Sequence, residues 1–355
     1  MPKALFFSVP LFNVSKTLTP IIEQLSLEKC EVIYYNTPDF KPDGNCHFDF
    51  IAYPDCFQGY YADQIHSAIS YIQFGDIFLD AAICLTNFLS SEIEREKPDF
   101  IIHSNLAVWG CLLAKHYKLP AITLYSTAVL DKRIVLPYFR KASMEKRLSF
   151  SNVNDAINYY RKSTVLYAKL GLKNKPDPWD AYINKGQLNI VCILKALQPH
   201  FGLLGTEFNF IGFPAPLRME ITDQKVLYVS MGTVLNGDVA FYSMCINVLR
   251  EFRMNTILSV GSKVRIEELP SPPDYIHIVP FTNQVRVLEE AVMFISRGGM
   301  ASIHEAIYTL TPMIVIPVIP EQRITAERIQ ELGIGIHIPS DQLSESCLQS
   351  AIQKM

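Results

Sequence analysis

A glycine pair joins a strand-like run to a helix-like run in the last quarter of the chain. The apolar run from Val292 to Ser296 precedes Gly298 and Gly299, and the helical pattern that follows carries Ser302 and Glu305. The first amides of a helix have no partner within it, so such a turn can bind an anion. Glycines let a phosphate approach the backbone closely. Alternatively, the segment is an ordinary β–α turn of an α/β domain.

The composition limits the possible classes of protein. At 355 residues the chain favours two domains, and a hydrophobic fraction of 49% suffices for two cores. The net charge of −3, with dispersed basic residues, argues against a nucleic-acid partner. No apolar run of about 18 residues or more is present, so no membrane span is expected. The N-terminal apolar run is interpreted as a first buried strand rather than a signal peptide.

Cysteine usage indicates the redox setting. The eight cysteines are scattered along the chain without a CxxC pair. Zinc binding is therefore not expected, and the pattern favours reduced cysteines in a cytoplasmic setting. No G-x-G-x-x-G opens either half, which argues against a nicotinamide enzyme.

Short β-branched runs alternate with helical periods through most of the chain, a pattern typical of parallel sheets with crossover helices. The stretch 132–180 is more helical and polar, and we expect it to cover a sheet edge. A proline-rich piece near position 214 resembles a linker. The expected architecture is α/β, with an N-terminal doubly wound domain at 1–213, a linker at 214–222 and a second doubly wound domain at 223–355. The predicted strands are Ala4 to Val9, Cys30 to Tyr35, Phe100 to His103, Ala121 to Tyr125, Val226 to Ser230, Thr256 to Val260, Ile276 to Val279, Val292 to Ser296 and Met313 to Pro317. The predicted helices are Thr17 to Leu27, Tyr60 to Lys97, Ala107 to Tyr117, Val239 to Glu251, Asn283 to Ala291, Ala301 to Tyr308 and Ile324 to Leu332.

Five ordered motifs of the second half resemble the nucleotide-sugar glycosyltransferases of the UDP-glycosyltransferase and macrolide-glycosyltransferase type. The matching segments are Tyr228 to Thr233, Pro280 to Gln284 with Leu288, Arg297 to Ser302 with Glu305 and Ala306, Pro312 to Pro317, Glu321-Gln322, and Ala326 to Gly333. The first half matches more weakly, mainly at Pro98-Asp99 and Trp109-Gly110. The resemblance implies the GT-B fold, in which two Rossmann-like domains face each other across a cleft. It also implies further helices that return to the first domain, which we expect this chain to lack.

The resemblance assigns the donor site to the C-terminal domain. Gln284 would hold the base edge, Glu305 the ribose hydroxyls and Gln322 the sugar hydroxyls. Ser302 and the amides of Gly299 to Ser302 would hold the diphosphate. The other donor-site candidates are Ser230, Gly232, Thr233, Phe281, Arg297, Gly298, Met300, Ala301 and Glu321.

Each of these roles has a structural alternative. Glu305 alternatively complements a helix dipole, Ser302 caps a helix locally, and Gln284 lies on a solvated helix face. The joint occurrence of the residues within the matched motifs favours donor binding.

The catalytic dyad of the family is substituted. In the resembling enzymes a histidine near the first β–α turn takes the acceptor's proton and an aspartate orients it. The corresponding positions here are Asn13 and Ser104. An asparagine amide cannot act as a base near neutral pH. His103 is a weak candidate base, although its strand neighbour points to the opposite face; alternatively it is a packed sheet histidine.

The donor loop differs from the family as well. The histidine before the glycine pair is Arg297 here, and arginine can donate two hydrogen bonds to phosphate oxygens. The usual Asp-Gln pair is Glu321-Gln322, which is one methylene longer. The common asparagine after the glycine pair is Ala301, which has no side-chain donor.

Three interpretations remain open for the activity. The first is a hexosyltransferase with another base. The second is a hexosyltransferase whose acceptor, such as a carboxylate, needs no base, with Arg297 and the helix N-terminus stabilising the leaving group. The third is a catalytically impaired paralogue that binds nucleotide or a partner enzyme.

The resemblance implies reaction with inversion, a UDP- or TDP-sugar as donor substrate and no separate cofactor. No metal is expected, since no Asp-x-Asp motif occurs. We expect a monomer or homodimer that acts on a lipophilic small-molecule acceptor. The first half is rich in aromatic residues, which either line an acceptor pocket or fill a core. These residues are Phe57, Tyr60, Tyr61, Tyr71, Phe74 and Phe78.

Overall fold

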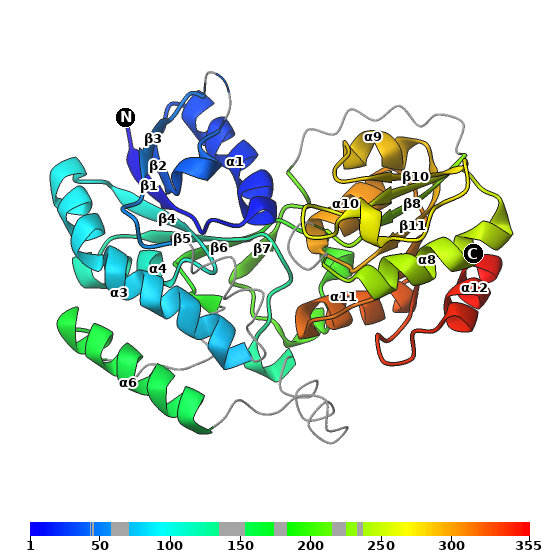
Figure 1. Cartoon of the computed structure of the whole chain (residues 1–355). Helices are drawn as coiled ribbons and strands as arrows, with labels where there is room; N and C mark the ends of the chain where they lie inside the picture. Colours follow the sequence, from blue (N-terminus) through cyan, green and yellow to red (C-terminus); the bar gives the residue numbers. More distant parts are fainter. Residues whose placement is uncertain are drawn as a thin grey trace. The chain divides into compact units, whose positions relative to one another are not determined.

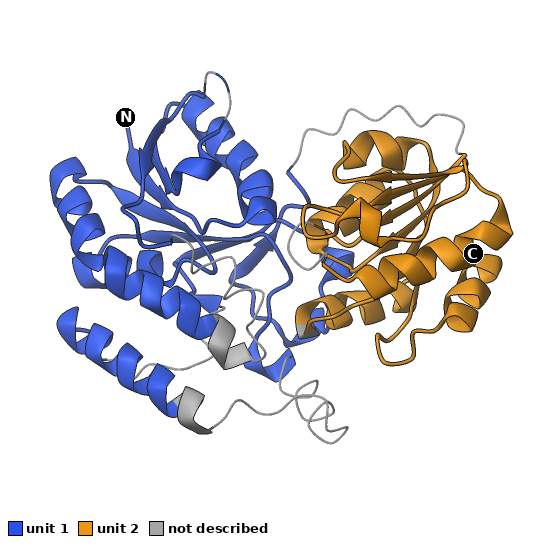
Figure 2. Cartoon of the chain, in the orientation of Figure 1, with its two compact units in different colours: residues 1–215 blue, residues 216–355 orange. Residues whose placement is uncertain are grey.

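The computed structural model of the chain contains two compact units, Met1–Ala215 and Pro216–Met355 (Figure 2). It describes residues 1–42, 44, 46–57, 71–134, 153–173, 183–214, 225–232 and 237–355. The division between the units falls within the predicted linker at 214–222. Tyr60, Tyr61 and Thr233 lie outside the described residues, as do the side chains of Tyr71 and Phe74.

The first unit is built on a parallel sheet with the strand order β3-β2-β1-β4-β5-β6-β7 (Figure 1). The strands are β1 (Lys3–Phe7), β2 (Glu31–Asn36), β3 (Asp49–Ala52), β4 (Phe100–Ser104), β5 (Ala121–Tyr125), β6 (Leu188–Val191) and β7 (Phe208–Phe210). The strand order reverses between β1 and β4. Ligands of doubly wound sheets bind outside the carboxyl ends of the strands at such a switch point.

Helices cover both faces of this sheet. They are α1 (Phe12–Leu27), α3 (Tyr71–Glu96) and α4 (Val108–Tyr117), and a further helix, α6 (Val153–Lys169), packs on α3. Tyr34 of β2 donates to Ser15 of α1 at 3.4 Å, whereas its neighbour Tyr35 donates to Glu92 of α3 at 2.9 Å. Because consecutive strand residues point to opposite faces, α1 lies on one face of the sheet and α3 on the other.

Two expectations about these helices need correction. Helix α1 begins at Phe12 rather than near Thr17, although Pro20 lies inside it. Asn13 therefore lies in the first turn of a helix instead of a loop. The described part of the stretch 132–180 includes α6, which packs on α3 through ion pairs from Lys162 to Asp76 at 2.7 Å and to Asp80 at 2.8 Å. It forms a further layer over α3 rather than covering a sheet edge.

Two of the six aromatic residues proposed for an acceptor pocket have described side chains, and both are in the core. Phe78 is fully buried, and Phe57 is 9% exposed. The ring of Phe57 packs against Tyr53 and Trp109, with ring centroids 5.7 and 6.1 Å apart. The core interpretation therefore holds for these two side chains.

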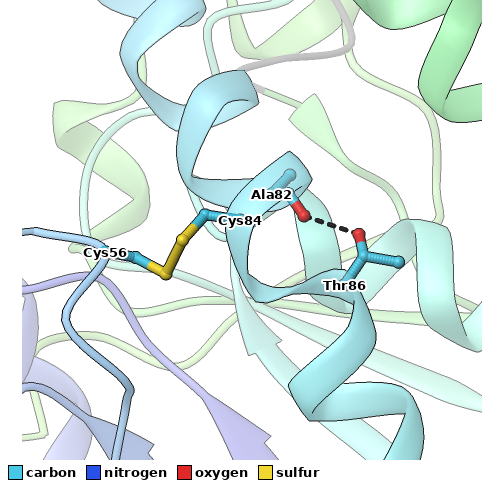
Figure 3. Close-up of a disulfide and its surroundings, with 4 residues drawn as sticks. All are labelled: Cys56, Ala82, Cys84 and Thr86. Carbon is cyan, nitrogen blue, oxygen red and sulfur yellow. Dashed lines mark hydrogen bonds between the residues drawn. A yellow bond between two sulfur atoms is a disulfide. The ribbon is translucent and has the colours of Figure 1, made fainter.

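A disulfide joins Cys56 to Cys84 of α3 and corrects the expectation that all the cysteines are reduced (Figure 3). The bond closes a sequence separation of 28 residues and ties the segment after β3 to α3. The remaining six cysteines are free. Sequence spacing could not reveal this pair, because nothing in the motif pattern brings position 56 next to position 84.

The second unit has a parallel sheet with the order β10-β9-β8-β11-β12-β13. Its elements are β8 (Val226–Ser230), α8 (Val239–Phe252), β9 (Thr256–Ser259), β10 (Ile276–Val279), α9 (Gln284–Glu289), β11 (Ala291–Ser296), α10 (Met300–Tyr308), β12 (Met313–Val315), α11 (Pro320–Glu331), β13 (Gly335–His337) and α12 (Glu345–Lys354). The strand order reverses between β8 and β11, and α12 packs against α8 (Figure 1). No helix among the described residues is long and apolar enough to cross a membrane.

Candidate functional site: the β11–α10 turn and its neighbours

The glycine turn lies at the switch point of the second sheet, between the end of β11 and the start of α10. Gly298 has a φ of +86°, and a Cβ at this position would lie 2.7 Å from Val315 Cγ1. Only glycine suits both the backbone and the space. Gly299 is the N-cap of α10 and provides no side-chain cap. The first amides of α10 are therefore available to a ligand, and the helix dipole favours an anion there.

The helix side chains that follow the turn divide between the core and the site. Met300 and Ala301 are 4% and 5% exposed and pack inward. Of these two residues, the backbone amides rather than the side chains are the groups that a ligand can reach.

Three residues predicted to bind the donor contact one another. Gln284 Nε2 donates to Ser302 Oγ at 3.0 Å and to Glu305 Oε2 at 2.6 Å. Tyr228 donates through its hydroxyl to Gln284 Oε1 at 3.4 Å. Glu305 is only 1% exposed, so its carboxylate is held in one place by α9 and α10 together. The family resemblance had assigned Gln284, Ser302 and Glu305 to the donor site, but not Tyr228, and it did not predict their contacts with one another.

Arg297 is a buried cation at the end of β11. It is 9% exposed, and its Nε is buried without a hydrogen-bond partner in the described part of the chain. Its guanidinium carbon lies 5.8 Å from the centre of the Phe241 ring, and Nη2 lies 3.8 Å from Asp238 Oδ2. Burial lowers the pKa of Arg297, and the negative charge of Asp238 opposes that shift. The planar, always charged guanidinium has donors suited to phosphate oxygens.

The start of α11 lies beside the same turn. A Cβ on Gly298 would be 3.6 Å from the carbonyl oxygen of Gln322. The side-chain oxygen of Gln322 accepts from the amides of Val318 at 3.0 Å and Ile319 at 3.4 Å. This anchoring fixes the carboxamide. Burial raises the pKa of the neighbouring Glu321 to about 7.

The remaining donor-site candidates follow β8 and β10. Ser230 ends β8 and pairs in register with Ser296 of β11, and its hydroxyl accepts from the amide of Gly232 at 3.4 Å. Gly232 has a φ of +79°. Phe281, just after β10, is 60% exposed. Its large exposed ring is available to a planar ligand group.

The first unit presents different chemistry at its own switch point. Asn13 is exposed in the first turn of α1, and Ser104 ends β4 with its hydroxyl buried and without a hydrogen-bond partner among the described residues. Ser104 lies one residue beyond His103, which pairs in register with Phe7 of β1. Neither Asn13 nor Ser104 carries a group that accepts a proton near neutral pH.

His103 does not fit the role of an alternative base. It is fully buried, and its Nδ1 lies 3.0 Å from the Ser104 carbonyl oxygen and its Nε2 3.2 Å from Thr123 Oγ1. The His103 side chain packs against α4, where a Cβ added to Gly110 would lie 2.4 Å from the Cβ of His103. Burial lowers the pKa of His103 to about 4. The helix α1, which carries Asn13, covers the other face of the sheet.

Motif comparison did not single out Asp238. It is the N-cap of α8, where its Oδ1 accepts from the amide of Phe241 at 2.9 Å, and it is the ion-pair partner of Arg297. An aspartate just before the predicted helix Val239 to Glu251 is a capping signal. Its pairing with a residue 59 positions away (297 − 238) has no signal in a single sequence.

Comparisons with known proteins agree with this architecture. Residues 244–355 match the family model of the erythromycin biosynthesis protein CIII-like C-terminal domain. The uncharacterized UDP-glucosyltransferase YojK of Bacillus subtilis is 26% identical over 350 residues, which cover 94% of this chain and 84% of that protein. The NDP-glycosyltransferase YjiC of Bacillus subtilis is 30% identical over 272 residues, covering 73% and 64%.

A solved structure provides the fold comparison. The glycotransferase of kitacinnamycin superposes with a TM-score of 0.83 at 23% identity, over 100% of this chain and 90% of that one. The resemblance expected from the motifs is confirmed, as is the doubly wound α/β architecture. The chain is similar to glycosyltransferases of the UDP-glycosyltransferase and macrolide-glycosyltransferase type, and it has the GT-B fold.

Proposed function

We propose that the chain transfers a hexose from a UDP- or TDP-sugar to a lipophilic small molecule, with inversion at the anomeric carbon. The observation that carries the proposal is the cluster of Gln284, Ser302 and Glu305 beside the uncapped N-terminus of α10. Its carboxylate can accept two ribose hydroxyls, while the amides and Arg297 suit a diphosphate.

The named relatives support the choice of substrates. YojK is named as a UDP-glucosyltransferase, and a relative from Streptomyces antibioticus is named as an oleandomycin glycosyltransferase. A structure with a TM-score of 0.70 is a spinosyn rhamnosyltransferase complexed with thymidine diphosphate. We extend to this chain a nucleotide-diphosphate sugar as donor and a small molecule as acceptor, with no separate cofactor.

The reaction would be a single displacement. An acceptor oxygen forms a bond to the anomeric carbon while the bond from that carbon to the diphosphate oxygen breaks, and the electron pair leaves with the diphosphate. Arg297 and the α10 amides are placed to stabilise the negative charge that develops there. An acceptor hydroxyl must also lose a proton, and neither Asn13 nor Ser104 accepts one.

The substituted dyad therefore limits the kind of acceptor group that the protein can use. We propose that the productive acceptor carries an oxygen that is already ionised near neutral pH, such as a carboxylate on an apolar scaffold. A carboxylate attacks without losing a proton, so general-base catalysis, typically worth about 10²- to 10⁴-fold, is not needed. A paralogue that only binds nucleotide is the competing function, and it shares the donor site.

Titration calorimetry with UDP, TDP and their glucose conjugates tests the donor site. Replacing Glu305→Ala removes a hydrogen-bond acceptor with a full charge, and we expect nucleotide affinity to fall about 10- to 100-fold. Glu290→Ala, an exposed glutamate after α9, is the matched control and should bind as the wild type does. Equal binding by the two variants would remove Glu305 from the site, and no binding of any nucleotide to the wild type would refute the donor-site proposal.

A further inference from the structure

Arg297 and Asp238 form an ion pair that does not satisfy the arginine. The distance of 3.8 Å from Nη2 to Oδ2 is too long for a hydrogen bond. Arg297 donates no side-chain hydrogen bond within the described residues, although it is 9% exposed. A buried charge without hydrogen-bonded partners is costly. The arrangement therefore leaves guanidinium donors available at the turn that precedes α10.

The capping role of Asp238 explains why the pair stays long. Asp238 Oδ1 accepts from the Phe241 amide at 2.9 Å, so the carboxylate is held at the N-terminus of α8. The helix dipole also favours a negative charge at that position. To approach Arg297 more closely, the carboxylate would have to weaken its cap. Asp238 therefore supplies a nearby negative charge without using the donors of Arg297.

We propose that Asp238 sets the affinity of the donor site, acting as a counter-charge that Arg297 exchanges for the diphosphate of the nucleotide. In the empty site Asp238 partly neutralises the buried guanidinium. In the complex the diphosphate takes over Arg297, and the half-exposed carboxylate of Asp238 is left to solvent. This inference rests on the proposed function, because it places the diphosphate at the N-terminus of α10.

The consequence is weaker binding of every ligand that carries the diphosphate. Asp238 competes for Arg297 and also repels the anion, so both the donor and the nucleoside diphosphate product leave more readily. Product release limits turnover in many enzymes. Asp238 is thus a positioning residue that trades affinity for turnover.

The substitution Asp238→Asn isolates the charge from the cap, because asparagine is about as good an N-cap as aspartate. We expect this variant to bind UDP and TDP about five- to tenfold more tightly, from the loss of one charge near the diphosphate. Uridine and thymidine, which lack phosphate, should bind both proteins equally. With a donor, KM and kcat should fall together.

The variant Arg297→Gln and the double variant show whether Asp238 acts through the arginine. In the Arg297→Gln background, Asp238→Asn should lose most of its effect on UDP and TDP affinity. Thermal unfolding of all the variants checks that each one folds. An Asp238→Asn protein that binds the nucleoside diphosphates no more tightly than the wild type would overturn the inference while leaving the donor site intact. Failure of the wild type to bind any nucleotide would overturn both.

Discussion

The two units repeat the same sheet plan but differ in chemistry at the switch point. Beside β8 and β11, the second unit places a buried arginine, a buried glutamate and an uncapped helix N-terminus. Beside β1 and β4, the first unit places Asn13 and Ser104, which have neutral side chains. In our account the half that binds the leaving group has its charges, whereas the half expected to deprotonate the acceptor has no base. If the proposal is right, donor binding and proton removal are separable in this fold.

The largest effect should come from giving the first unit a base. Because Asn13 is exposed in the first turn of α1, Asn13→His should be accommodated. We expect turnover of an alcohol acceptor to rise at least 100-fold, the lower range of general-base catalysis. Turnover of a carboxylate acceptor should stay nearly constant, since it has no proton to lose.

Asn13→Gln is the control for changing the side chain without adding a base. Rates are measured by product chromatography with both acceptor types. Equal gains with the alcohol and the carboxylate would indicate a change in binding, and would contradict the claim that only the base is missing.

Removing the disulfide should weaken the first unit and spare the second. Cys56→Ser opens a connection that spans 28 residues, and the chain-entropy model gives a loss of about 3.6 kcal/mol in unfolding free energy. Nucleotide affinity should not change, because the proposed donor residues belong to the other unit. Denaturant unfolding and calorimetry provide the two readouts.

Cys347→Ser, a half-buried free cysteine in the second unit, is the matched control for the loss of a thiol. Thiol titration of the denatured, unreduced wild type should count six free thiols. A count of eight would contradict the disulfide.

A substitution in the glycine turn should have the opposite pattern, acting on the second unit. Gly298→Ala places a Cβ 2.7 Å from Val315 Cγ1 at a φ of +86°. The left-handed backbone costs an L-residue about 1 to 2 kcal/mol, and the close contact adds to this. Both the unfolding free energy and the nucleotide affinity should fall. Gly333→Ala has a φ of +68° with nothing within 4 Å, so it pays only the backbone cost. Equal nucleotide affinity in the two variants would separate the turn from the donor site.

The smallest predicted effect is a change in the affinity for the donor sugar with pH. Burial raises the pKa of Glu321 to about 7, so the folded protein holds this proton more tightly than the unfolded chain. Its contribution to stability is complete below the unfolded pKa near 4.5 and is lost as pH rises through about 7. We expect the ionised carboxylate to accept sugar hydroxyls above that pH, so binding of UDP-glucose, whose diphosphate does not titrate in this range, should strengthen from pH 6 to pH 8. Glu321→Gln should remove this strengthening of UDP-glucose binding; an unchanged pH dependence in the variant would exclude Glu321.

The sequence predicted the strands whose apolar runs are bounded by clear breaks. Strands β5, β8 and β10 have the predicted bounds. The short strand β13 was not predicted, because it contains only Gly335–His337 and its glycine signals a turn. In the structure that glycine is needed for close packing, since a Cβ would lie 2.5 Å from the Met313 carbonyl oxygen. Likewise α1 begins earlier than predicted because its N-cap, Leu11, gives no capping signal.

The candidate site was predictable where its residues follow one motif and not where they meet across space. Ser302 and Glu305 lie on one helix, one turn apart, and the family motifs assigned both of them, with Gln284, to the donor site. The long pair between Arg297 and Asp238 depends on how α8 packs beside β11, which a single sequence does not specify. The same holds for the burial of His103, since its packing against Gly110 arises only in the folded sheet.

The most direct test of the central claim is a competition between two acceptors of the same shape. The wild-type protein is incubated with UDP-glucose or TDP-glucose and an equimolar mixture of an aryl carboxylic acid and the corresponding alcohol, and both products are quantified by mass spectrometry. Our account predicts the glycosyl ester as the dominant product. Transfer to the alcohol at an equal or higher rate would show that a base acts in this protein, and would contradict the account.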